Sequence, residues 1–215
     1  LEGMRSPPQH AMAVDRVRWQ GEPVVAVVAQ SRAIAEDALE LIEVKYNELP
    51  VAVDMESALD VDAEVIHKDY ENNLCWERNV SAGDVESAFG EADAVIEEEF
   101  QFGRHTGVTL ESRSIVADYD PGEEMLTLYQ STQAPHMKQA LFAKHLQLEE
   151  HKIRIICRDV GGAFGLKAHA YGDEFATAAI SKMLKRPVKF VADRMESFLA
   201  DIHARDHVVK GKIGV

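Results

Sequence analysis

A glycine-rich segment, Asp159-Val160-Gly161-Gly162-Ala163-Phe164-Gly165, follows an apolar strand pattern and precedes a helical pattern. Glycines at such a junction let backbone N–H groups approach a ligand, and the start of the helix favours anions. Their spacing does not match the dinucleotide-binding pattern. The segment is not a P-loop either, because Lys167 follows Leu166 instead of glycine and precedes Ala168 instead of Ser or Thr. On these residues alone, a plain tight turn and a ligand cradle remain equally good interpretations.

A second polar segment, Ser131-Thr132-Gln133, follows the preceding strand pattern. Met125 to Cys157 reads as strand, helix, strand, a crossover that normally joins two parallel strands. Ligands of open α/β sheets collect outside the carboxyl ends of strands, so the two segments could face one pocket. Gln133 has amide donors and an acceptor that can orient a polar ligand. For Gln133 alone, bonding to local backbone is the plainer interpretation.

The elements that would position these segments follow from periodicity and capping signals. From residue 83 they are a helix capped by Asp84 and ending at Ala92, strands Ala94–Phe102, Ile115–Tyr119 and Met125–Gln130, helix His136–Leu146, strand Lys152–Cys157, helix Tyr171–Leu184, and strands Pro187–Val191 and Val208–Val215. We expect Glu97-Glu98-Glu99 to be a solvated edge.

The first part of the chain predicts a separate ββα-β unit. Arg16–Gln20 and Val24–Ala29 flank a Gly-Glu-Pro turn as a hairpin, and Ser31 can cap a helix. Leu41–Tyr46 then returns as a strand.

The polar, aperiodic stretch 60–73 is typical of a linker. We therefore expect a domain over residues 1–65, a linker over 66–82 and a second domain over 83–215. The first ten residues begin without any element, so we expect the N-terminus to be truncated.

Composition narrows the class of protein. The chain has 215 residues, of which 46% are hydrophobic, and a formal net charge of -14. The acidic surface disfavours nucleic acid and anionic membranes as partners, and the longest apolar run, Pro23–Ala29, is too short to cross a bilayer, so we expect no membrane insertion. Two cysteines without metal-ligand spacing fit a reducing cytoplasm.

Six segments, in the same order and over nearly the whole chain, resemble the molybdenum-cofactor large subunit of the xanthine dehydrogenase and aldehyde oxidase family, which includes the carbon monoxide dehydrogenase large chain. They are Arg16–Val24, Asn79–Phe89, Leu110–Arg113, Ser131–Gln133, the glycine turn, and Arg186–Lys189. The resemblance implies an α+β (mixed α/β) fold. An α/β-hammerhead domain would come first, followed by part of the first molybdopterin-binding domain.

The resemblance also implies a cofactor and its neighbours. In this family a pterin dithiolene holds molybdenum, and a metal-bound hydroxide is transferred to an electron-poor carbon. By resemblance, Gln133 lies beside the oxo ligand of the metal. Phe164 and Gly165 lie against the metal and the pterin, and Gly161 and Gly162 allow the backbone to approach the cofactor.

Two residues depart from the family pattern. Ala163 stands in place of a third glycine, which a backbone with an ordinary φ tolerates. Ala168, in the substrate vicinity, stands where xanthine-oxidising members have a glutamate that grips the purine, so purine oxidation is disfavoured. Lys167 completes the motif and is expected to be structural or solvent-facing.

No catalytic residue is assigned within the chain, because the resemblance places the family's catalytic glutamate beyond Val215. Glu111 lies in the family-like segment Leu110–Arg113, but we expect it to form an ion pair with Arg113 or a neighbour instead of acting as the base.

The leading hypothesis is a fragment of a molybdenum-cofactor oxidoreductase that hydroxylates an aldehyde, an N-heteroaromatic or a related small substrate, and that is inactive alone. Its partners would be the rest of the large subunit and chains or domains that carry iron-sulfur clusters and FAD, because two cysteines cannot hold a cluster. The alternative is a non-catalytic assembly module that binds partner subunits without a cofactor.

Overall fold

The computed structural model describes residues 2–215 and has two compact units. The larger one, here called the sheet unit, contains Gln9–Tyr46 and Thr106–His203. The smaller one, here called the ribbon unit, contains residues 2–8, Asn47–His105 and Ala204–Val215. No helix within residues 2–215 is long and apolar enough to cross a membrane.

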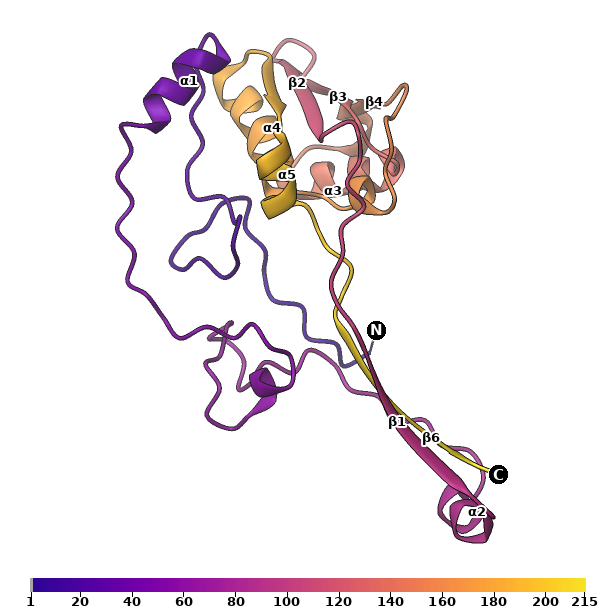
Figure 1. Cartoon of the computed structure of the whole chain (residues 1–215). Coiled ribbons are helices and arrows are strands. Elements are labelled where there is room, and N and C mark those ends of the chain that lie inside the picture. The colour runs from indigo at the N-terminus through magenta and orange to yellow at the C-terminus, as the bar shows by residue number, and fades with distance from the viewer. Residues whose placement is uncertain (1) are drawn as a thin grey trace. The chain divides into compact units, whose positions relative to one another are not determined.

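The sheet unit is built on four strands (Figure 1). They are β2 (Ser114–Asp120), β3 (Met125–Gln130), β4 (Ile153–Ile156) and β5 (Val188–Val191), in the order β4-β3-β2-β5. β2 is antiparallel to both β3 and β5, whereas β3 and β4 are parallel. Helix α3 (Pro135–Leu146) connects β3 to β4. The predicted crossover is therefore confirmed.

The core of this unit lies between the sheet and helices α3 and α4 (Gly172–Leu184). Alternate residues of β2 and β3 face the helices, because successive side chains of a strand point to opposite faces. The buried cluster consists of Ile115, Ala117, Leu126, Leu128, Phe142, Ala143, Ile153 and Ala178. Phe142 of α3 packs against Phe175 of α4 with ring centroids 4.6 Å apart. This packing holds the sheet, including β3 and β4, against the two helices.

Local capping signals explain several helix starts. The Ser31 side chain accepts a hydrogen bond from the Ile34 N–H at the start of α1 (Arg32–Leu39), as predicted. Sequence reasoning missed α5 (Arg194–Ala200), although Asp193 and Glu196 form a capping box there. The remaining short elements are 3₁₀ turns η2 (Glu150–Lys152) and η3 (Leu166–Ala168).

The strands predicted for the front of the chain are absent. Arg16–Gln20, Val24–Ala29 and Leu41–Tyr46 form no strand, so only the helix of the ββα-β prediction is correct. The apolar pattern of these segments satisfies β propensity, but a strand also needs a hydrogen-bonded partner, and none pairs with them among residues 2–215. The side chains of Val25 and Leu41 are accordingly exposed.

The ribbon unit contains a two-stranded antiparallel ribbon (Figure 1). β1 (Val95–Phe102) pairs with β6 (His207–Gly214) along their full lengths. Helix α2 (Val85–Glu91) precedes the ribbon, with Asp84 at its N-cap as predicted, and the 3₁₀ turn η1 (Ser57–Leu59) belongs to the same unit. Glu97, Glu98 and Glu99 are exposed as predicted, and Glu99 forms an ion pair with Lys210.

Candidate functional site

The structure brings Gln133 and the glycine turn together. Gln133 lies three residues beyond the end of β3, and the turn follows the neighbouring parallel strand β4. Its side-chain Oε1 accepts a hydrogen bond of 3.1 Å from the Gly165 N–H, and its backbone N–H donates to the Lys167 carbonyl at 3.3 Å. The two segments that the sequence placed at adjacent strand ends are thus in direct contact.

This contact also sets which end of the Gln133 amide is free. A backbone N–H can only donate, so the atom facing Gly165 must be the amide oxygen, and the NH₂ group points elsewhere. Within residues 2–215, Nε2 of Gln133 has no hydrogen-bond partner, and the residue is exposed. Gln133 therefore presents a hydrogen-bond donor to its surroundings.

The turn combines backbone at positive φ with N–H groups that have no protein acceptor within residues 2–215. Gly162 and Gly165 have φ values of 97° and 93°, and Phe164 adopts a φ of 48°, which is unusual for a residue with a side chain. For Phe164 this conformation costs about 1–3 kcal/mol, a strain that proteins often retain at functional sites. In the part of the chain that the structure describes, the N–H groups of Gly162, Ala163 and Phe164 donate to no protein acceptor. Three adjacent donors are thus available to a ligand.

Position 163, where the family pattern has a third glycine, accommodates alanine in this turn. Ala163 is not among the residues with positive φ, so its methyl group causes no backbone strain. The Phe164 side chain at the tip of the turn is 79% exposed. A strained backbone that displays a large apolar ring is typical of a surface that a ligand or another part of the protein covers.

Gly161 is placed differently from the other glycines of the turn. Its N–H donates to Oε2 of Glu111 at 2.7 Å, so this donor already has a protein partner. A Cβ at position 161 would lie 2.5 Å from Cβ of Glu111, closer than real Cβ atoms approach. The close packing against Glu111 therefore requires glycine here.

We expect Gly161→Ala to destabilise the complete enzyme by about 1–3 kcal/mol, because the new methyl group must push Glu111 away from the turn. Urea unfolding measures the change. Gly90→Ala is the matched control, since Gly90 lies in helix α2 and a Cβ there would meet no atom within 4 Å. Alanine at position 90 should stabilise the helix by about 0.5–1 kcal/mol. Equal effects of the two substitutions would contradict the packing argument.

Glu111 is the residue on which several segments converge. Oε2 of its carboxylate accepts hydrogen bonds from Ser131 Oγ at 2.6 Å, Gly161 N–H at 2.7 Å and Lys167 Nζ at 2.7 Å. The predicted ion pair of Glu111 is thus formed with Lys167, and the suggestion of Arg113 as its partner is wrong. Lys167 is fully buried, so of its two expected placements the structural one is correct.

The ionised form of Glu111 is strongly favoured over the protonated form. Partial burial raises the pKa of this carboxyl, but the hydrogen bonds from Lys167, Ser131 and Gly161 outweigh it and lower the pKa to about 2. A carboxylate with such a low proton affinity is a poor general base at neutral pH.

This pKa predicts a pH dependence of stability. Because the pKa in the folded state lies near 2 and the ordinary value is 4.5, Glu111 stabilises the fold fully above about pH 4.5 and loses this contribution as the pH falls towards 2. The difference in free energy of unfolding between the wild type and Glu111→Gln should therefore shrink between pH 4.5 and pH 2. Urea unfolding at pH 6 and pH 3 checks this, and a difference that is the same at both values would contradict it.

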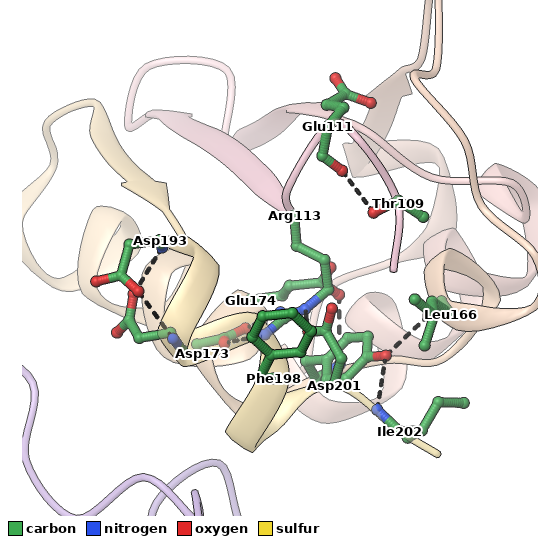
Figure 2. A network of polar contacts seen from close by, with 12 residues as sticks. Thr109, Glu111, Arg113, Leu166, Asp173, Glu174, Asp193, Phe198, Asp201 and Ile202 are labelled. Carbon is green, nitrogen blue, oxygen red and sulfur yellow. Dashed lines mark hydrogen bonds and ion pairs between the residues drawn. The ribbon is translucent and has the colours of Figure 1, made fainter. Parts of the chain in front are cut away.

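A second polar network, which sequence reasoning missed, supports the far side of the turn (Figure 2). The Arg113 guanidinium is 1% exposed and donates to Asp201 and, in a bidentate contact, to Asp173. It also stacks on the Tyr171 ring, with Cζ 3.7 Å from the ring centroid. The Tyr171 hydroxyl donates to the carbonyl of Leu166 at 2.9 Å, and Leu166 directly follows the turn.

The network was not visible in the sequence, because Asp173 and Asp201 lie 60 and 88 residues from Arg113. Figure 2 shows the side chains of Glu111 and Arg113 pointing in opposite directions from the same segment. The segment Leu110–Arg113 thus supplies the central charged residue of each network, Glu111 in one and Arg113 in the other. Beside them, Lys138 of α3 and Glu174 of α4 form a further buried ion pair at 2.8 Å.

Ala168, which the resemblance placed near the substrate, ends η3 next to Lys167. Its N–H donates to the carbonyl of Gly165 at 3.3 Å, and its side chain is partly buried. It lies close to the turn along the chain, and its role towards a substrate stays a prediction.

Comparison with known proteins bears on the identity of this site. The profile of the molybdopterin cofactor-binding domain matches residues 66–215, and that of the aldehyde oxidase and xanthine dehydrogenase a/b hammerhead domain matches residues 2–50. The chain is 38% identical over 208 residues to the nicotine 6-hydroxylase large subunit of Paenarthrobacter nicotinovorans, which covers 97% of this chain and 25% of that protein. It is 34% identical to the carbon monoxide dehydrogenase large chain of Afipia carboxidovorans, over 93% of this chain and 26% of that one.

The crystal structure of quinoline 2-oxidoreductase from Pseudomonas putida 86 superimposes with a TM-score of 0.94 and 34% identity, over 99% of this chain and 27% of that one. The chain spans about a quarter of the length of the curated relatives it matches. The fold class inferred from the sequence is confirmed, whereas the domain boundaries at residues 65 and 83 stay predictions. The chain belongs to the xanthine dehydrogenase and aldehyde oxidase family of molybdenum hydroxylases, with a hammerhead domain and a molybdopterin cofactor-binding domain.

Proposed function

We propose that this chain forms part of the cofactor site of a molybdenum oxidoreductase that hydroxylates an aldehyde, an N-heteroaromatic compound or a related small substrate. The observation that carries the proposal is the group of unpaired donors at two parallel strand ends, namely Nε2 of Gln133 and the N–H groups of Gly162, Ala163 and Phe164. When bound, the molybdenum cofactor transfers oxygen to the substrate carbon and takes up two electrons.

The residues of the chain would bind and orient this group. Nε2 of Gln133 is suited to donate to an oxygen ligand of the metal, because Oε1 is held by Gly165 and cannot turn outward without losing that bond. The free N–H groups of the turn would donate to acceptor atoms of the cofactor, and the exposed Phe164 ring would cover it and exclude water. Gly165, with its positive φ, lets the chain bend around the group.

The same geometry limits the chemistry of the chain's own side chains. Ala168 offers no polar side chain, which argues against a purine held at this position. Glu111 is ionised and its Oε2 is engaged by three donors, so it does not serve as the base. The general base, which would take the proton of the hydroxyl group bound to the metal, would therefore be another residue of the complete enzyme.

Electron transfer would require partners. The chain has two cysteines, Cys75 and Cys157, fewer than the four ligands of a common iron-sulfur cluster. We therefore propose that iron-sulfur clusters and FAD are carried by other chains or domains, together with the rest of the large subunit, in a cytoplasmic complex. One relative is a subunit of the 6-hydroxypseudooxynicotine dehydrogenase complex, in line with a multi-subunit assembly.

Metal and pterin analysis of the complete natural complex tests the proposal. We expect about one molybdenum per large subunit and the fluorescence of an oxidised pterin after acid release. A non-catalytic assembly module would give a folded complex with neither molybdenum nor pterin, and that result would overturn the proposed function.

A further inference from the structure

One oxygen atom, Oε2 of Glu111, accepts hydrogen bonds from the glycine turn and from the residue that follows it closely in the chain. Gly161 lies in the first half of the turn and Lys167 lies two residues after Gly165, and both donate to Oε2 of Glu111, Gly161 from its backbone and Lys167 from its side chain. The Glu111 N–H in return donates to the Gly161 carbonyl at 3.2 Å. The segment 161–167, which contains Gly162 to Gly165, is thereby held to Glu111 at both ends.

The same carboxylate also contacts the segment after β3 that contains Gln133. Oε2 accepts from the hydroxyl of Ser131, two residues before Gln133. The carbonyl of Lys167 accepts from the Gln133 N–H at 3.3 Å and from the Thr132 hydroxyl at 2.8 Å. Gln133 is thus tied to Glu111 on one side through Ser131 and on the other through Lys167.

These contacts depend on the charge of Glu111. Lys167 is 0% exposed, and a buried ammonium group needs a counter-charge because it has lost its hydration. Nζ of Lys167 has Glu111 as its ion-pair partner at 2.7 Å. A neutral side chain at position 111 would leave Lys167 uncompensated and free to withdraw from the turn.

The geometry points to Glu111 as a positioning residue that holds the glycine turn against the Gln133 strand end and so sets the distance between the two sets of donors. The inference rests on the proposed function, because it assigns a role towards the same cofactor. Glu111 itself acts through Gly161, Ser131 and Lys167 and not by contact with the reacting atoms.

The test uses the complete holoenzyme with Glu111→Gln. A displaced turn should lower kcat by about 10- to 100-fold while KM changes much less, since small misplacements of reacting groups have effects of this size. In the molecules that retain molybdenum, the electron paramagnetic resonance spectrum of the Mo(V) state should change, because its line shape reports the geometry around the metal. An unchanged spectrum together with unchanged kcat would overturn the inference.

Two further variants separate positioning from stability. The double variant Glu111→Ala/Lys167→Met lacks both charges, so no unpaired charge is buried and the protein should fold. Its Mo(V) spectrum should still differ from that of the wild type, and its kcat should still be low. Wild-type values in this double variant would overturn the inference. Ser181→Ala is the stability control, because the fully buried Ser181 hydroxyl lies within hydrogen-bond distance of the carbonyls of Ala117 and Arg186 and accepts from the Tyr119 N–H, away from the turn. It should lower the unfolding temperature and leave the Mo(V) spectrum unchanged.

Hydrogen exchange distinguishes this inference from the proposed function. Amides of the peptide 161–168 should exchange deuterium faster in Glu111→Gln than in the wild type, whether or not metal is bound. Equal exchange rates would contradict a positioning role for Glu111. A wild-type complex without molybdenum whose variant still shows faster exchange would instead refute the proposed function alone.

Discussion

Arg113→Met is expected to destabilise the complete enzyme by about 3–5 kcal/mol, because it leaves the carboxylates of Asp173 and Asp201 without their cation in a buried site. Burial alone would lower the pKa of Arg113, but the hydrogen bonds and charges of these two residues raise it above its ordinary value. The substitution also removes the guanidinium that stacks on Tyr171. Urea or thermal unfolding measures the loss.

Two variants make this result specific. Arg32→Met removes the same side chain from exposed ion pairs with Glu36 and Asp193, in which the three side chains are 56%, 55% and 47% exposed, and should change stability by less than about 1 kcal/mol. Arg113→Lys keeps the charge but not the planar fork, so it should recover only part of the loss. Similar effects at positions 113 and 32 would show that the buried network is not a major source of stability.

Gln133→Glu is expected to lower kcat of the complete enzyme by about 10²- to 10³-fold, the effect of losing one donor that faces developing negative charge. The substitution is nearly isosteric, and one carboxylate oxygen can still accept from the Gly165 N–H. The other presents an acceptor where Gln133 presented a donor. Steady-state kinetics with molybdenum content measured on the same sample checks this.

Gln147→Glu is the matched control, since it makes the same chemical change at an exposed position at the end of α3. Its kcat per molybdenum should equal that of the wild type. If Gln133→Glu also retained full activity per molybdenum, the donor role of Gln133 would be refuted.

Much of the sheet unit could be predicted because its signals are local. The β2–β3 hairpin has a turn at Asp120-Pro121-Gly122, and α1 has a serine at its cap. The strand, helix, strand pattern from Met125 to Cys157 implied adjacent parallel strands, and this topology placed Gln133 beside the turn. The strands predicted at 24–29 and 41–46 were wrong because propensity does not supply a pairing partner.

The support of the site was harder to predict. Lys167 lies 56 residues from Glu111 in the sequence, and no spacing rule links them. The closeness of Glu111 and Arg113 in the sequence even suggested that the two pair, whereas they belong to separate networks. Only α5 had a readable local signal that was missed, because Asp193 and Glu196 have the spacing of a capping box.

A crystal structure of the complete enzyme with its cofactor tests the central claim most directly. We expect Nε2 of Gln133 within about 2.7–3.2 Å of an oxygen ligand of molybdenum, and the N–H groups of Gly162, Ala163 or Phe164 donating to atoms of the cofactor. A molybdenum site built without contact to Gln133 or the turn, with these donors turned to solvent or to other protein groups, would contradict the account.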